Sequence, residues 1–159
     1  MHHDIMIDWK MCKQDFEWDG SWRDIYVFHT TLEDWRLLFA LLRSDYQLEI
    51  STDGTVQSLP TANDDLLALP QEFLPHWRFR VGGLRVVCHF FSSDQMEFDV
   101  DPREITSQTG LDTLLGFVQR LGDFISKPVV LTPENGPEIP IITYDPKTRA
   151  FQYHEIAAS

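Results

Sequence analysis

Hydrophobic and polar residues follow two periods along this chain, the 3.6-residue period of an α-helix and the two-residue period of a β-strand. The clearest helical pattern follows Thr31, where four apolar residues share one helical face: Trp35, Leu38, Phe39 and Leu42. Thr31 and Asp34 have the spacing of a capping box, in which each side chain bonds the backbone N–H of the other residue. The pattern therefore predicts a helix that starts at Thr31 and buries this apolar stripe.

A second helix is predicted to start near Thr109, with Asp112 three residues on, and to end before Pro128. Its apolar positions again share one face: Leu111, Leu114, Leu115, Val118, Leu121 and Ile125. Gly116 and Gly122 lie inside this segment, although each costs up to about 1 kcal/mol relative to Ala. We expect close packing against a sheet to offset that cost.

The remaining pattern is typical of strands separated by turns. The segment "DIYVF" (24–28) is apolar on both faces, which indicates a central strand. Residues 46–59 and 77–91 each predict a hairpin, with turns at Asp53-Gly54 and Gly82-Gly83. Three more strands are predicted after the second helix, at 128–132, 139–145 and 150–155.

Strands before, between and after two helices predict an α+β fold. We expect a single domain over residues 1–159, with a largely antiparallel sheet and two main helices packed on one face. Residues 1–10 are a candidate mobile N-terminal segment.

The segment "MEFDVDPRE" (96–104) carries four carboxylates in nine residues. As a strand, it places Met96, Phe98 and Val100 on one face and Glu97, Asp99 and Asp101 on the other. A three-residue loop at 92–94 would pair this strand with the preceding hairpin so that both faces sort by polarity. The apolar pairs are then Phe90 with Met96, Cys88 with Phe98 and Val86 with Val100. The other face pairs His89 with Glu97, Val87 with Asp99 and Arg85 with Asp101, which leaves Asp99 and Asp101 on the wetter side.

Three interpretations of the acidic row are open: the solvated side of a sheet, a docking surface for a basic partner, or a metal site. Glu97, Asp99 and Asp101 with His89 would supply hard ligands for a divalent ion. Alternate strand residues lie about 6.5–7 Å apart, however, which is wide for a compact carboxylate cage. Arg85 would also compete for Asp101. We therefore predict no metal site and no cofactor.

The charge balance narrows the classes of partner. The net charge is −12 and the isoelectric point is about 4.7, which opposes binding to nucleic acid and to anionic membranes. The N-terminal sequence lacks the pattern of a signal peptide, and no apolar run is long enough to span a membrane. Two cysteines, Cys12 and Cys88, are too few for a disulfide framework, so a cytoplasmic protein is expected.

No recognised catalytic motif is present, and no catalytic residue is predicted. Cys88 and His89 are adjacent in a strand and therefore point to opposite faces. The segment "TPENGPEIP" (132–140) contains three prolines between two predicted strands. It is either a stiff connection or a preorganised recognition loop that presents Glu134, Asn135 and Glu138 outward.

The segments "DGSWRDIYVFHTTLEDW" and "KPVVLTPENGPEIPIITYDP" resemble parts of small, acidic, uncharacterised bacterial proteins, some of which resemble the immunity partners of secreted toxins. The resemblance implies a protein that opposes a basic toxin surface with an acidic one.

The sequence favours a non-enzymatic protein-binding module that neutralises a basic partner through an acidic surface, and leaves its oligomeric state open. The candidate contact residues are Phe91, Glu97, Asp99, Asp101, Glu134, Asn135 and Glu138. One alternative is a small hydrolase-like enzyme, which a cleft containing His29, His89, Asp99 and Asp101 would favour. Another is an accessory subunit of a larger assembly.

Overall fold

A single antiparallel sheet runs through the part of the chain that the computed structural model describes, residues 7–46, 48–52, 55–58 and 76–155. Its nine strands follow the order β3-β2-β4-β5-β6-β1-β7-β8-β9. The strands are β1 (Arg23–Phe28), β2 (Glu49–Thr52), β3 (Thr55–Ser58), β4 (His76–Val81), β5 (Leu84–Ser92), β6 (Gln95–Val100), β7 (Val129–Pro133), β8 (Ile142–Asp145) and β9 (Ala150–Tyr153).

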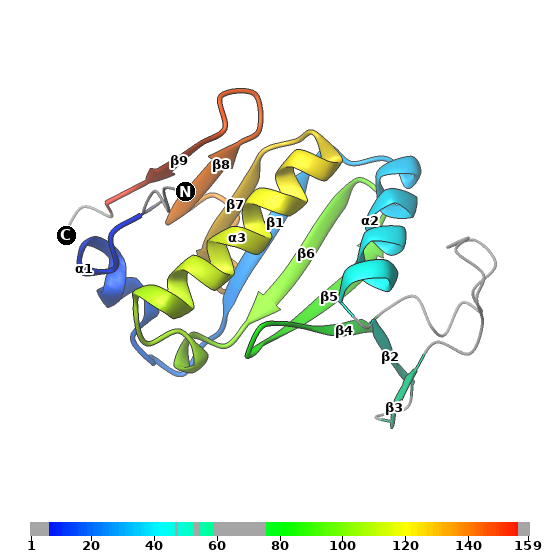
Figure 1. Cartoon of the computed structure of the whole chain (residues 1–159), viewed down its shortest axis with the longest axis horizontal. Coiled ribbons are helices and arrows are strands. Elements are labelled where there is room, and N and C mark those ends of the chain that lie inside the picture. Colours follow the sequence, from blue (N-terminus) through cyan, green and yellow to red (C-terminus); the bar gives the residue numbers. More distant parts are fainter. Residues whose placement is uncertain (1–6, 47, 53–54, 59–75, 156–159) are drawn as a thin grey trace.

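Two long helices, α2 (Leu32–Asp45) and α3 (Gln108–Ile125), cover one face of the sheet (Figure 1). Shorter helical segments are α1 (Trp9–Cys12), η1 (Lys13–Phe16) and η4 (Pro102–Glu104). The predicted α+β fold, with a largely antiparallel sheet and two helices on one face, is confirmed. Among the described residues, neither α2, α3 nor a shorter helix combines the length and apolarity that crossing a bilayer requires.

The capping box predicted for α2 is present. Thr31 Oγ1 accepts from the Asp34 N–H at 3.2 Å, and the Thr31 N–H donates to Asp34 Oδ2 at 3.0 Å. All four residues of the predicted stripe are buried: Trp35, Leu38, Phe39 and Leu42. The helix start and its buried face therefore follow from local sequence.

Helix α3 begins at Gln108, one residue before the predicted start, because Ser107 caps it by accepting the Gly110 N–H at 3.3 Å. The six apolar residues predicted to share its face are buried. Gly122 lies against the sheet, where an added Cβ would stand 2.7 Å from the Tyr144 ring. Gly116 has no atom within 4 Å of such a Cβ, so the expected close packing holds only at Gly122.

The predicted register of the β4–β5 hairpin is confirmed, with Val81 opposite Leu84 across Gly82-Gly83. The β2–β3 pairing agrees with the other predicted hairpin, although its turn residues 53–54 lie outside the described residues. Of the candidate mobile segment 1–10, residues 1–6 lie outside the described residues, whereas Ile7 is buried and Trp9 opens α1.

The β5–β6 register is confirmed at Val86–Val100, Val87–Asp99, Cys88–Phe98 and His89–Glu97. The predicted three-residue loop is wrong, because the register shifts by one residue and pairs Ser92 with Gln95. Phe90 is consequently only half-buried, against Trp35. The Ser93 carbonyl accepts from Thr30 Oγ1 at 2.7 Å and from Trp35 Nε1 at 3.1 Å, so contacts with the α2 side favour the tighter turn.

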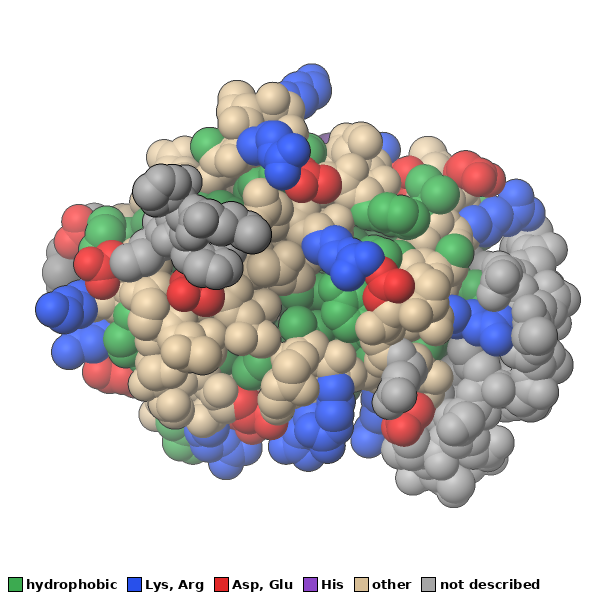
Figure 2. Space-filling view, in the orientation of Figure 1, with side chains coloured by type: hydrophobic (Ala, Val, Ile, Leu, Met, Phe, Trp, Pro, Cys, Tyr) green, Lys and Arg blue, Asp and Glu red, His purple; other side chains and the backbone are tan. Residues whose placement is uncertain are grey.

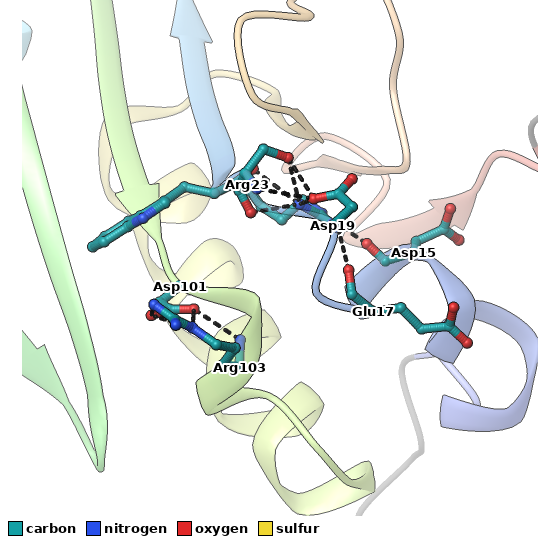
Figure 3. A network of polar contacts seen from close by, with 8 residues as sticks. Asp15, Glu17, Asp19, Arg23, Asp101 and Arg103 are labelled. Atoms are coloured by element: carbon teal, nitrogen blue, oxygen red, sulfur yellow. Dashed lines mark hydrogen bonds and ion pairs between the residues drawn. The ribbon is translucent and has the colours of Figure 1, made fainter.

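The predicted pairing of Arg85 with Asp101 is also wrong. Strand β6 ends at Val100, and Asp101 caps η4 by accepting the Arg103 N–H at 2.9 Å. The Arg103 guanidinium also binds this carboxylate, at 2.9 Å, and Asp101 is buried rather than on a wet face (Figure 3). Arg85 pairs with Glu104 instead, at 3.4 Å. A 3-10 turn that starts with Pro102 therefore redirects the end of the acidic row.

A buried arginine holds the segment that leads into β1. The Arg23 guanidinium donates to the carbonyls of Asp15, Glu17, Ser21 and Trp22 at 2.8–3.1 Å (Figure 3). It is only 4% exposed, and these carbonyls replace the water that its donors lose. The chain before β1 is thereby fixed against the sheet.

Candidate functional site

The helix-free face of the sheet carries two rows of side chains that cross several strands. Residues directly opposite each other in an antiparallel pair share a face, so the register identifies each row. The first row is Arg78, Val87, Asp99, Asp24 and Thr132, and the second is His76, His89, Glu97, Tyr26 and Val130. Polar groups from β4, β5, β6 and β1 therefore meet at the centre of this face.

Three carboxylates form the acid cluster: Asp24 on β1, and Glu97 and Asp99 on β6. One carboxylate oxygen from each lies within 4.8 Å of the others. The Tyr26 hydroxyl lies 3.0 Å from Asp24 Oδ2 and 3.1 Å from Glu97 Oε1, so it joins two of the three. The cluster combines two neighbouring β6 positions with a residue 73 positions earlier in the chain.

Asp24 is the most buried member of the acid cluster, with 1% of its surface exposed. Burial raises its pKa to about 7, and the adjacent Asp99 carboxyl contributes to the same shift. The Asn135 N–H donates to Asp24 Oδ2 at 2.8 Å and partly opposes the rise. Asp24 is therefore close to half-protonated near neutral pH.

A histidine pair borders the acid cluster on its β5 side. His89 Nε2 lies 2.5 Å from Asp99 Oδ2, and its Nδ1 lies 3.1 Å from Nδ1 of His76. Burial alone would lower the His89 pKa, but the hydrogen bond to Asp99 and the nearby carboxylates outweigh it and raise the pKa. Burial and the neighbouring His89 lower the pKa of His76. A proton on the pair is thus held by His89.

Exposed groups flank the acid cluster on two sides. Phe91 is 69% exposed and stacks on the His89 ring, with centroids 5.2 Å apart. On the other side, the segment 133–140 returns over Asp24 through the Asn135 N–H. Asn135 has a left-handed backbone (φ 56°), which Asn tolerates better than most residues, and Gly136 N–H closes the turn on the Pro133 carbonyl at 3.1 Å. Glu134, Asn135 and Glu138 are exposed, as is Ile139 at 41%.

The structure brings together some of the candidate contact residues and separates others. Glu97, Asp99 and Asn135 lie beside Asp24, and Phe91 stacks on His89 at the border of the acid cluster. Asp101 is instead turned away and buried against Arg103. His29 is exposed at the end of β1, so of the four residues proposed for a catalytic cleft only His89 and Asp99 meet.

No sequence pattern identified Asp24, Tyr26 or His76 as site residues, because their places at the site depend on which strands become neighbours. The only local signal for Asp24 is that it is the one charged residue of "DIYVF". A polar residue in a central strand needs a partner.

The arrangement can hold a proton or attract a cation. Carboxylate oxygens are hard donors that suit Ca²⁺ or Mg²⁺. Several of the oxygens already accept hydrogen bonds from Tyr26, Asn135 and His89, and these bonds stabilise the cluster without an ion.

Two surface cavities lie away from the acid cluster. One, of about 380 Å³, lies beside β4 and β5 and is lined in part by Trp22 and three arginines. The other, of about 440 Å³, is a shallow hollow beside α3 that includes Gln119, Asp123 and Arg149. Neither is lined by a residue of the acid cluster.

Comparisons with known proteins give no relative from which to transfer a function. No protein-family model matches the chain, and neither a curated protein nor a solved structure matches it significantly.

Proposed function

We propose that this protein is a non-enzymatic, immunity-type binding module that docks a basic protein on the helix-free face of its sheet. The observation that carries the proposal is that exposed groups border the acid cluster on two sides. Phe91 stacks on His89, and the loop that carries exposed Glu134, Glu138 and Ile139 binds Asp24 through the Asn135 N–H. Protein interfaces combine an aromatic or aliphatic anchor with a polar rim, and this surface contains both.

Charge complementarity indicates a basic partner. The face carries Glu97 and Asp99 at its centre and two glutamates on the adjoining loop, within a chain of net charge −12. Such a surface accelerates encounter with a positive protein and slows it with a negative one. Arg78 and Arg80 of β4 and Arg85 of β5 are separated by β6 and β1 from β7, the strand that leads into the loop.

The opposite side of the molecule supports the choice of face. Over the helices, acidic and basic side chains are interspersed rather than gathered by sign (Figure 2). The proposal includes a cytoplasmic location, which is supported by two free and buried thiols, Cys12 and Cys88.

The test uses parallel affinity captures from lysate of the source cells. The baits are wild type, Phe91→Ala, the double variant Glu134→Lys/Glu138→Lys, and the control Glu17→Lys, which reverses an exposed charge outside this face. A specific partner is retained by wild type and by the control and is lost with the other two baits. We expect it to have a net positive charge.

The purified partner then allows a kinetic measurement. The association rate of wild type should fall steeply between low and physiological salt, and the glutamate reversals should lower it at least about tenfold at low salt. A partner that binds all four baits with equal affinity would contradict the proposal, and so would an association rate that does not change with salt. Glu97 and Asp99 are left intact because both belong to the internal hydrogen-bond network.

A further inference from the structure

Three arginines gather at the cavity of about 380 Å³ beside β4 and β5. Its lining includes Trp22, Glu49, Arg78, Arg80, Arg85 and Val87. In a chain with 13 basic and 25 acidic residues, three guanidinium groups around one cavity make a local positive surface that opposes the overall charge.

The three guanidinium groups are poorly neutralised by the protein. Arg80 and Arg85 lie directly opposite each other across β4 and β5, where like charges repel. Arg85 forms an ion pair with Glu104 at 3.4 Å and lies near Asp101, but its side chain is 60% exposed and these interactions are screened by water. Within the described ranges, Arg78 and Arg80 form no ion pair. The site therefore has donors to offer to an anion.

The cavity also has a fixed aromatic wall. Trp22 is half-buried, and its carbonyl accepts from the Arg23 guanidinium at 3.1 Å. Arg23 is itself buried and bound to three other carbonyls, so the backbone that carries the indole is held in place. A flat apolar ring beside cationic groups suits a ligand with a planar part and an anionic part.

We propose that this cavity binds a small phosphomonoester, with the phosphate on Arg78 and Arg80 and a planar group against Trp22. Guanidinium groups bind phosphate oxygens through paired, charge-assisted hydrogen bonds. The cavity volume lies within the range of small-molecule sites, roughly 300–1,000 Å³. The proposal does not depend on protein docking, because the cavity contains no residue of the acid cluster and none of the loop 134–139.

One carboxylate at the cavity opposes the anion. Glu49 lies opposite Arg78 in the β2–β4 pairing and lines the same space. Its negative charge should weaken phosphate binding, so Glu49→Gln should strengthen it while Arg80→Gln weakens it. Opposite effects from two neutralising changes at one cavity distinguish a site from a general response to net charge.

The experiment is a calorimetric titration of the full chain with three probes: inorganic phosphate, AMP and uncharged adenosine. We expect AMP to bind more tightly than phosphate, and adenosine to bind at least about tenfold more weakly than AMP. Arg80→Gln should weaken AMP binding about tenfold, and Glu49→Gln should strengthen AMP binding about threefold. Trp22→Leu should weaken the binding of AMP but leave the binding of inorganic phosphate unchanged.

Lys147→Gln is the matched control, since it removes one positive charge from the β8–β9 turn at the other end of the sheet. It should bind AMP like wild type, and circular dichroism should show that all the variants remain folded. The proposal is overturned if AMP produces no binding up to about 5 mM. It is equally overturned if adenosine binds with the same affinity as AMP, or if Arg80→Gln and Lys147→Gln change the affinity for AMP by the same factor.

Discussion

At the residue scale, the centre of the helix-free face depends on Asp24, a carboxyl buried in the middle of the sheet. It is tolerated there because Tyr26 O–H and Asn135 N–H donate to it and because burial favours its uncharged, protonated form. His89 sits on the other side of Asp99 and is favoured in its charged form. The network thus balances three carboxyls against a hydroxyl, a backbone N–H and an imidazole.

Replacement of Asp24 by Asn should change how stability depends on pH. Because the pKa of Asp24 is raised to about 7 in the folded protein, folding binds a proton between about pH 4 and pH 7. Its contribution to stability is therefore lost as the pH rises through this window. Asp24→Asn removes that loss. Between pH 4 and pH 8, the free energy of unfolding of the variant should therefore rise relative to that of wild type, by on the order of 2–4 kcal/mol.

Urea unfolding at several pH values measures this difference. Glu17→Gln, at an exposed side chain, is the control and should follow wild type at every pH. A difference between Asp24→Asn and wild type that stays constant from pH 4 to pH 8 would show that Asp24 does not bind a proton on folding.

At the element scale, Gly122 determines how closely α3 approaches the sheet. Its two interior glycines differ in their surroundings, although both lie in the same regular helix. Gly122 contacts Tyr144 of β8 and Val129 of β7, while Gly116 faces open space. Tyr144 is fully buried, and its hydroxyl donates to Asp123 Oδ1 at 2.5 Å. The helix and β8 are thus held together at Gly122.

Substitution of the two glycines by alanine should have opposite effects. Gly122→Ala places a methyl group 2.7 Å from the Tyr144 ring and should destabilise the protein by about 1–3 kcal/mol. Gly116→Ala meets no neighbour within 4 Å and should stabilise it by about 0.5–1 kcal/mol through helix propensity. Thermal and urea unfolding of the two variants against wild type provide the comparison, and equal effects at both sites would refute the proposed contact.

At the scale of the whole molecule, charge is distributed unevenly. Carboxyl groups gather in the acid cluster and the loop 134–138 carries two more, whereas three arginines gather at the cavity beside β4 and β5. The excess of 12 negative charges must still repel itself over the surface. Exposed pairs such as Arg36–Glu33 offset this repulsion only slightly.

Moderate salt should therefore stabilise the protein. Raising NaCl from about 10 mM to about 150 mM shortens the Debye length from roughly 30 Å to 8 Å and screens the net repulsion. We expect the thermal unfolding midpoint at pH 7.5 to rise by a few degrees and then to level off. A midpoint that falls over this range would mean that attractive ion pairs outweigh the repulsion.

Local sequence determined the features of this protein that depend on interactions between residues close together in the chain. The start of α2 follows from the hydrogen bonds between Thr31 and Asp34, and the buried faces of both helices follow from a period of 3.6 residues. The β4–β5 register follows from a two-residue turn and from the need to keep one strand face apolar. These causes operate between residues close together in the chain, so they can be read from it.

Tertiary structure alone decided the chemistry of the site. Asp24 reaches Glu97 and Asp99 because β1 lies beside β6, and no short-range pattern specifies that neighbour. The β5–β6 turn tightens because Thr30 and Trp35, about 60 residues earlier in the chain, bind its Ser93 carbonyl. The protonation of Asp24 likewise depends on burial, which only the assembled sheet creates.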